Sequence, residues 1–90
     1  MTQTKEMEER RRIREAVTGL LDQRDLGKTI CPSEASREVF GQRGNEREYM
    51  DRTRDVVREL VAEGVVEVCQ RGNVVDMDGV RGPIRVRKKS

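Results

Sequence analysis

The side chains best suited to chemistry in this sequence are arginines, three of which share one side of a predicted helix. Arg47, Arg54 and Arg58 are separated by seven and four residues. On a helix over residues 46–63 they fall within roughly 40° of each other, since each residue turns the helix by about 100°. A guanidinium group pairs bidentately with guanine in the major groove of DNA, and it also binds backbone phosphates. The spacing therefore indicates a basic helical face that is suited to nucleic acid.

Further basic residues lie where they would extend this face along a nucleic-acid backbone. One precedes the helix in a polar turn, one lies at the tip of a predicted β-hairpin, and five of the last ten residues are basic while none is acidic. The nucleic-acid contacts that the sequence predicts are Arg43, Arg47, Arg54, Arg58, Arg71, Arg85, Arg87, Lys88 and Lys89.

The same arginine pattern is also typical of a solvated helix, or of a surface that faces another protein. Glu48, Asp55, Glu59 and Glu63 occupy the neighbouring sector of the helix. Side chains three or four residues apart on a helix form ion pairs with one another. Asp51 lies within the arginine stripe and would repel phosphate. Because fold does not by itself determine function, both interpretations stay open at this point.

A second hypothesis is a protein-interaction or self-assembly module. Residues 59–80 contain five acidic side chains and one basic side chain, opposite in sign to the basic tail over residues 81–90. Complementary charges of this kind can join two copies of a chain or bind a larger partner. Arg85 and Arg87 alternate with apolar residues, as the outward positions of an edge strand also would. The preferred ligand is double-stranded DNA, with RNA and protein as the alternatives.

The sequence lacks histidine and the motifs that mark common catalytic sites. The sequence has no histidine, no nucleophile motif and no phosphate-binding glycine loop, so we expect no enzymatic activity, cofactor or small-molecule ligand. Cys31 and Cys69 cannot make a four-ligand zinc site unless carboxylates or a second chain complete it. We expect them to be small buried or half-buried thiols, with a redox role as the alternative. Phe40 and Tyr49 fall on apolar stripes, which argues against binding of single strands by base stacking.

Apolar periodicity predicts three helices that position the arginines. In residues 5–23 apolar side chains recur at three- and four-residue steps, the pattern of one buried helical stripe. A short second helix begins near Pro32, because proline suits the first helical turn. Residues 41–45 form a polar turn that contains glycine. The third helix spans residues 46–63 and ends before Gly64, as helices commonly do at a glycine.

Strands are expected before the second helix and after the third. Thr29-Ile30 is long enough only for a minimal strand. Residues 65–70 are rich in valine, Gly72-Asn73 is a two-residue hairpin signal, and residues 74–77 return as the second strand of a ribbon. The apolar face of this ribbon is expected to cover the helices.

The order helix, short strand, helix, helix and two-stranded ribbon is that of a winged helix, a helix-turn-helix variant whose hairpin is the wing. The expected fold is mainly α with a small β-ribbon, α-β-α-α-β-β, in a single domain over residues 1–90. Residues 1–9 and 88–90 are expected to be mobile, while Ile84 and Val86 dock onto the domain. The charged N-terminus is unlike a signal peptide, and no apolar run approaches the length of a membrane span, so we expect a cytoplasmic protein.

Three short motifs occur in order along the chain, at residues 28–35 (KTICPSEA), 67–72 (EVCQRG) and 81–87 (RGPIRVR). On these motifs the chain resembles a bacterial family of small winged-helix-like proteins that is catalogued as a domain of unknown function. The resemblance extends from about Ile13 to Arg87 and implies a winged-helix-like fold, with no activity or ligand attached. Members of the family usually carry Trp near the position of Glu46 and Thr at the position of Cys69.

Overall fold

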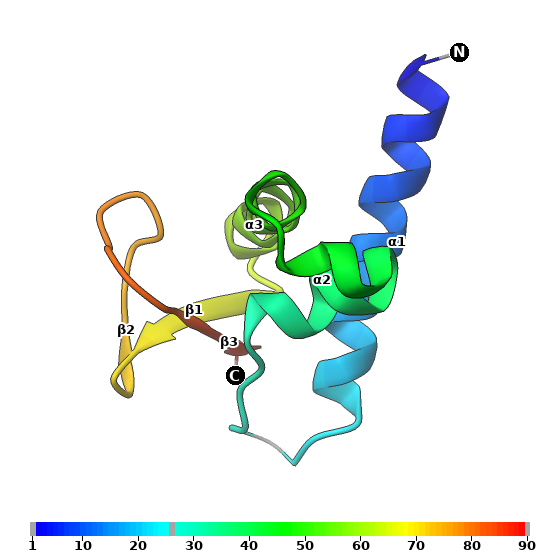
Figure 1. The fold of residues 1–90 in the computed structure, drawn as a ribbon. Helices are drawn as coiled ribbons and strands as arrows, with labels where there is room; N and C mark the ends of the chain where they lie inside the picture. Colours follow the sequence, from blue (N-terminus) through cyan, green and yellow to red (C-terminus); the bar gives the residue numbers. More distant parts are fainter. Residues whose placement is uncertain (1, 26, 90) are drawn as a thin grey trace.

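The computed structural model describes residues 2–25 and 27–89 as three helices packed against a small antiparallel sheet (Figure 1). The helices are α1 (Thr2–Asp22), α2 (Pro32–Phe40) and α3 (Arg47–Ala62), with a 3₁₀-helix, η1 (Gly41–Asn45), between α2 and α3. The strands are β1 (Val66–Gln70), β2 (Asn73–Val74) and β3 (Arg85–Lys88). This is the mainly helical, winged-helix-like architecture that the sequence predicted.

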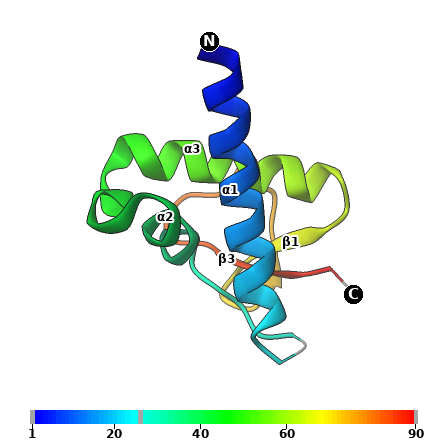
Figure 2. The same cartoon turned by 90° about the vertical axis from the view of Figure 1, so that its right-hand side faces the viewer.

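One hydrophobic core joins the helices to the sheet. In Figure 2, α1 crosses in front of α3, and the two helices pack through the apolar stripes that the sequence predicted. The side chains with less than 2% exposure include Ile13 and Val17 of α1, Val56, Val57 and Leu60 of α3, and Val66, Val68, Ile84 and Val86 of the sheet region. Residues 5–8 are exposed, where α1 projects beyond α2 (Figure 1). The mobility predicted for residues 1–9 and 88–90 stays a prediction.

The connection between α2 and α3 is tight because a glycine lies directly against a helix backbone. Ser36, which is fully buried on α2, donates a hydrogen bond from its Oγ to the carbonyl oxygen of Gly44 at 2.7 Å. A Cβ added to Gly44 would lie 2.5 Å from the carbonyl carbon of Ser36. The close approach of η1 to α2 thus depends on the missing side chain at residue 44, and it determines where α3 begins.

The sheet has the strand order β2-β1-β3, with both pairs antiparallel. β3 pairs with β1 along its full length, from Val66 opposite Lys88 to Cys69 opposite Arg85. Ile30 forms an isolated bridge with Val86 through two backbone hydrogen bonds of 2.8 Å. The minimal strand expected at Thr29-Ile30 therefore exists as this single bridge, and it pairs with β3.

The hairpin turn predicted at Gly72-Asn73 is wrong by one residue. The turn residues are Arg71 and Gly72, with φ of 54° and 84°, and they place Gln70 opposite Asn73. A two-residue hairpin turn with positive φ at both positions matches the twist of the flanking strands, which outweighs the local preference of the Gly-Asn pair.

The ribbon predicted from residues 65–70 and 74–77 is also wrong in its second strand. β2 ends at Val74, which is 58% exposed. The backbone N–H of Val75 still donates to the carbonyl oxygen of Val68 at 2.9 Å, and the chain then leaves the sheet before returning as β3. Ile84 and Val86 bury their side chains almost completely in the core, which favours pairing of this segment with the other edge of β1. The order of helices and strands along the chain is therefore α-α-α-β-β-β, with the single bridge at Ile30 before α2. Residues 85–88, which were expected to belong to a tail, form the strand β3.

Smaller expectations at the ends of α3 and at the cysteines are confirmed. Glu46 is the N-cap residue of α3, and Gly64 follows its end with a φ of 79°. Cys31 is a half-buried free thiol and Cys69 is a buried one. No helix in the described ranges 2–25 and 27–89 is apolar over a length that would cross a membrane.

Candidate nucleic-acid interface

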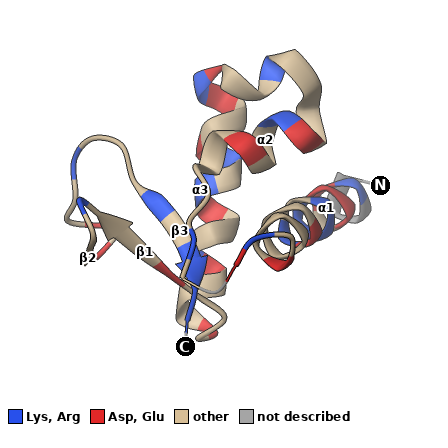
Figure 3. Cartoon of the chain, turned by 90° about the horizontal axis from the view of Figure 1, so that it is seen from below, with Lys and Arg blue, Asp and Glu red and all other residues tan. Residues whose placement is uncertain are grey.

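The arginine stripe of α3 faces away from the core. The buried side of the helix consists of Thr53, Val56, Val57 and Leu60. Arg47 and Arg58 are exposed, as the helical spacing predicted, whereas Arg54 is half-buried. Figure 3 shows basic and acidic segments following one another along α3, so this face is mixed in charge. Which of the arginines is free to bind a ligand depends on the carboxylates around each of them.

Arg58 is held by two carboxylates. Its Nε donates to Asp78 Oδ1 at 2.9 Å, and its Nη1 donates to Asp55 Oδ1 at 2.8 Å. Asp78 belongs to the loop between β2 and β3, which bends back toward α3 (Figure 1). The hydrogen bond with Asp78 raises the pKa of Arg58 above its ordinary value, aided by the charge of Asp78 and by the hydrogen bond and charge of Asp55, and it outweighs the opposing effect of desolvation. Its guanidinium is therefore already engaged.

Arg47 and Arg54 differ from Arg58 in this respect. Neither forms an ion pair with any side chain that the structure describes, although Asp51 lies on the same face and is exposed. Their guanidinium groups remain available to an external anion. Arg47 and Arg54 are seven residues apart, which corresponds to about 10.5 Å along the helix axis at about 1.5 Å per residue.

Arg43 lies in η1, just before α3. Its Nε is 3.8 Å from Glu46 Oε2, and its guanidinium carbon is 5.9 Å from the centre of the Tyr49 ring. The Tyr49 ring in turn packs against Phe40 with 4.7 Å between ring centres. Arg43 is thus exposed at the N-terminal end of α3, beside a small aromatic cluster that anchors this end of the helix.

The structure does not bring Arg71 next to the α3 stripe. In Figure 1 the turn between β1 and β2 lies at the far end of the wing from α3. Close to this turn, Gln70 Nε2 donates to the carbonyl oxygens of Arg81 and Pro83, at 2.6 and 3.3 Å. Arg81 is exposed and was missed as a candidate, although it begins the basic segment after the hairpin. Neither arginine has an ion-pair partner among the described side chains.

The basic residues of the predicted tail are mostly engaged within the fold. Arg85 donates from Nε to Thr29 Oγ1 at 2.9 Å, which ties β3 to the segment before α2. Arg87 pairs with Glu67 on the neighbouring strand at 3.3 Å, and Lys88 pairs with Asp22 at the end of α1 at 2.5 Å. Lys89 is exposed and shows no ion pair with a described side chain. The basic strand therefore contributes less free charge than its composition indicates.

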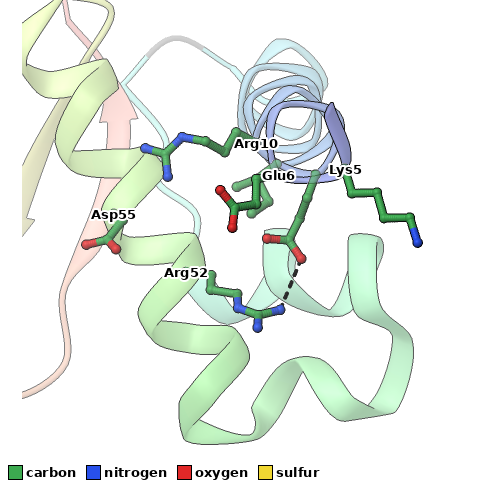
Figure 4. Close-up of a pocket in the computed structure, with 7 residues that line it drawn as sticks. Lys5, Glu6, Arg10, Arg52 and Asp55 are labelled. Atoms are coloured by element: carbon green, nitrogen blue, oxygen red, sulfur yellow. Dashed lines mark hydrogen bonds and ion pairs between the residues drawn. The ribbon is translucent and has the colours of Figure 1, made fainter. Parts of the chain in front are cut away.

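A hollow of about 460 Å³ between α1 and α3 is lined by both basic and acidic side chains (Figure 4). Arg52 reaches from α3 to Glu9 of α1 at 3.2 Å, while Lys5 points away from the hollow. Further along the helices, Arg14 Nη2 lies 2.6 Å from Glu63 Oε1, and the hydrogen bond from Arg14 lowers the pKa of Glu63. The mixed charges here fasten the two helices together and do not form a pocket of one sign.

A comparison against protein-family models gives a match over most of the chain. The model of one family matches residues 10–89. The chain belongs to the family described as Protein of unknown function (DUF3253). A comparison with curated proteins gives no match. The match covers all of α3 and the sheet, so the predicted resemblance to an unknown-function family is confirmed, and the function has to be argued from the site itself.

The predicted contacts thus divide into engaged and free side chains, with Arg43 between them because Glu46 lies 3.8 Å from its Nε. Arg58, Arg87 and Lys88 form ion pairs within the chain at less than 3.5 Å, and Arg85 is hydrogen-bonded to Thr29. The basic side chains left without a carboxylate within 4.0 Å, among the side chains that the structure describes, include Arg47, Arg54, Arg71, Arg81 and Lys89.

Proposed function

We propose that this domain binds double-stranded DNA through the exposed face of α3, as a non-enzymatic module. The observation that carries the proposal is the pair Arg47 and Arg54, whose guanidinium groups have no ion-pair partner among the described side chains. Their separation of about 10.5 Å along the helix is close to three base steps of about 3.4 Å each. A helix that packs one side into the core and offers such a pair to solvent has the arrangement of a recognition helix.

The charges around this pair favour modest, weakly specific binding. Asp51 and Asp55 lie on the same helix and limit how many phosphates can approach. If the domain neutralises about four phosphates, the plot of log affinity against log salt has a slope near −3.6. Binding therefore falls steeply as salt rises, and it should be measured first at low ionic strength.

The test is a titration of a labelled short duplex with the wild-type domain and two matched double variants. Arg47→Ala with Arg54→Ala removes two charges from α3. Arg11→Ala with Arg12→Ala removes two charges from exposed positions of α1. We expect the α3 variant to lose roughly tenfold or more in affinity, equal to about 1.4 kcal/mol, and to reduce the salt slope by about two. The α1 variant should lose much less.

Two results would refute the proposed DNA binding. One is the absence of duplex binding at low salt. The other is an equal loss of affinity in the two double variants, since that would show a dependence on net charge with no role for the α3 face. Competition with single-stranded DNA and with an RNA duplex then identifies which nucleic acid the face prefers.

Self-assembly is less well supported as the function. Four of the five carboxylates in residues 59–80 pair with basic side chains of the same chain: Glu59 with Arg10, Glu63 with Arg14, Glu67 with Arg87 and Asp78 with Arg58. These four carboxylates are therefore already paired within one copy, three of them with arginines of α1 and α3 and one with Arg87 of β3. Sedimentation over a range of concentrations tests this alternative, and a monomer at every concentration would count against it.

A further inference from the structure

The loop between β2 and β3 places an acidic side chain inside the proposed DNA-binding face. Asp78 accepts a hydrogen bond from Arg58 Nε at 2.9 Å, and Arg58 belongs to the same stripe as Arg47 and Arg54. A carboxylate that accepts from a guanidinium takes the position that a phosphate oxygen would otherwise occupy. The Asp78 carboxylate thus occupies a position on Arg58 where a DNA phosphate could bind.

The loop stays in place for reasons that do not depend on this ion pair. Met77, next to Asp78, is only 8% exposed, and Val75 and Val80 on either side pack against the core. Asp76 Oδ1 accepts the backbone N–H of Asp78 at 2.9 Å, which fixes the local turn. The pair itself is exposed, with 47% and 70% exposure of the two side chains, so it contributes little to stability. A role in folding therefore does not account for Asp78.

We propose that Asp78 is an internal counter-ion that competes with DNA phosphate for Arg58 and so restrains the affinity of the α3 face. This inference rests on the proposed function. Contact between Arg58 and a bound duplex requires phosphate to displace the Asp78 carboxylate, which lies on a loop held beside the helix. The loop thereby limits how many arginines of the stripe can bind phosphate.

The key variant is Asp78→Asn, which keeps the size of the side chain and an acceptor oxygen but removes the charge. The matched control is Asp76→Asn, which makes the same change of net charge on the same loop and keeps an oxygen that can accept the Asp78 N–H. Of these two loop residues only Asp78 contacts Arg58, whose other carboxylate partner, Asp55 on α3, is unchanged in both variants. We expect Asp78→Asn to bind a short duplex roughly three- to tenfold more tightly than wild type at low salt, with a salt slope steeper by about one.

The affinity of the control variant for the duplex should rise clearly less, because a charge that does not contact Arg58 acts only at longer range and is screened. A third comparison places Asp78→Asn in the background of Arg58→Ala. Without Arg58, the increase in duplex affinity caused by Asp78→Asn should be no larger than that caused by Asp76→Asn. Thermal unfolding of each variant verifies that the domain remains folded.

The outcomes separate the two proposals. If neither wild type nor Asp78→Asn binds a duplex, the proposed function is wrong and this inference fails with it. If wild type binds but Asp78→Asn gains no more than Asp76→Asn, or binds more weakly, the counter-ion role alone is refuted. A larger gain for Asp78→Asn that disappears without Arg58 supports it.

Discussion

Replacing Gly44 by alanine should destabilise the domain strongly, although the change adds one methyl group. The new Cβ would lie 2.5 Å from both the carbonyl carbon and the oxygen of Ser36, and 2.6 Å from the nitrogen of Arg37. All three are backbone atoms of α2, so no side chain can rotate out of the way. α2 and η1 must separate by about 0.5 Å even to reach 3.0 Å, a distance shorter than real Cβ contacts normally are.

The expected loss in the free energy of unfolding is the sum of an overpacking term and a hydrogen-bond term. Overpacking a well-packed site by one methyl group costs about 1–3 kcal/mol. The separation also lengthens the buried hydrogen bond from Ser36 Oγ to Gly44, now 2.7 Å, which is worth about 1 kcal/mol. The sum of about 2–4 kcal/mol is a large share of the roughly 5–15 kcal/mol that stabilises a typical domain. For a domain of this size it lowers Tm by about 8–32 °C.

The assay is thermal and urea unfolding followed by circular dichroism, with Gly19→Ala as the control. Gly19 lies inside α1, and a Cβ there would meet no atom within 4 Å beyond the neighbouring backbone of its own helix. Alanine is a better helix former than glycine by about 0.5–1 kcal/mol, so this variant should be more stable than wild type. The same substitution is thus expected to act with opposite signs at the two positions.

A Gly44→Ala variant that unfolds at the wild-type temperature would refute the reasoning, because it would mean that η1 does not approach α2 as closely as described. A variant that does not fold at all agrees with the prediction. In that case urea titration of Ser36→Ala, which removes the same hydrogen bond without adding a clash, should show a smaller loss of about 1–3 kcal/mol.

Three further predictions concern the sheet, an ion pair and the thiols. Ile84→Ala should cost about 2–5 kcal/mol in urea unfolding, because the side chain is 2% exposed, whereas Val74→Ala at 58% exposure should change stability by less than about 0.5 kcal/mol; similar values would mean that residue 84 is not in the core. Arg14 lowers the pKa of Glu63 in the folded state, so this stabilisation is present above the unfolded pKa, near 4.5, and is lost as pH falls through the lower folded value. The advantage of wild type over Glu63→Gln in Tm should therefore be present at neutral pH and vanish in acid, and an advantage that does not change with pH would contradict this. A thiol reagent should modify the half-buried Cys31 faster than the buried Cys69 in the native protein, and equal rates would indicate that Cys69 is accessible.

Local patterns in the sequence were sufficient for the helices and for the general architecture. The three- and four-residue spacing of apolar side chains identifies the buried stripes of α1 and α3, because a helix has only one face that can pack. Pro32 and Gly64 mark ends of helices for local backbone reasons. The exposed stripe of Arg47, Arg54 and Arg58 follows from the same periodicity. These features involve residues a few positions apart, so the sequence determines them.

Pairing over long separations was decided only by the tertiary structure. Residues 74–77 were expected to form the second strand of a ribbon, but β2 ends at Val74. β3, in the segment expected to be a tail, pairs with the other edge of β1, with Val86 buried in the core. The state of each arginine likewise depends on distant carboxylates, such as Asp78, twenty residues from Arg58. Spacing along a helix shows which face a side chain occupies, but it contains no information on which partner a fold brings to it, because that requires the course of the whole chain.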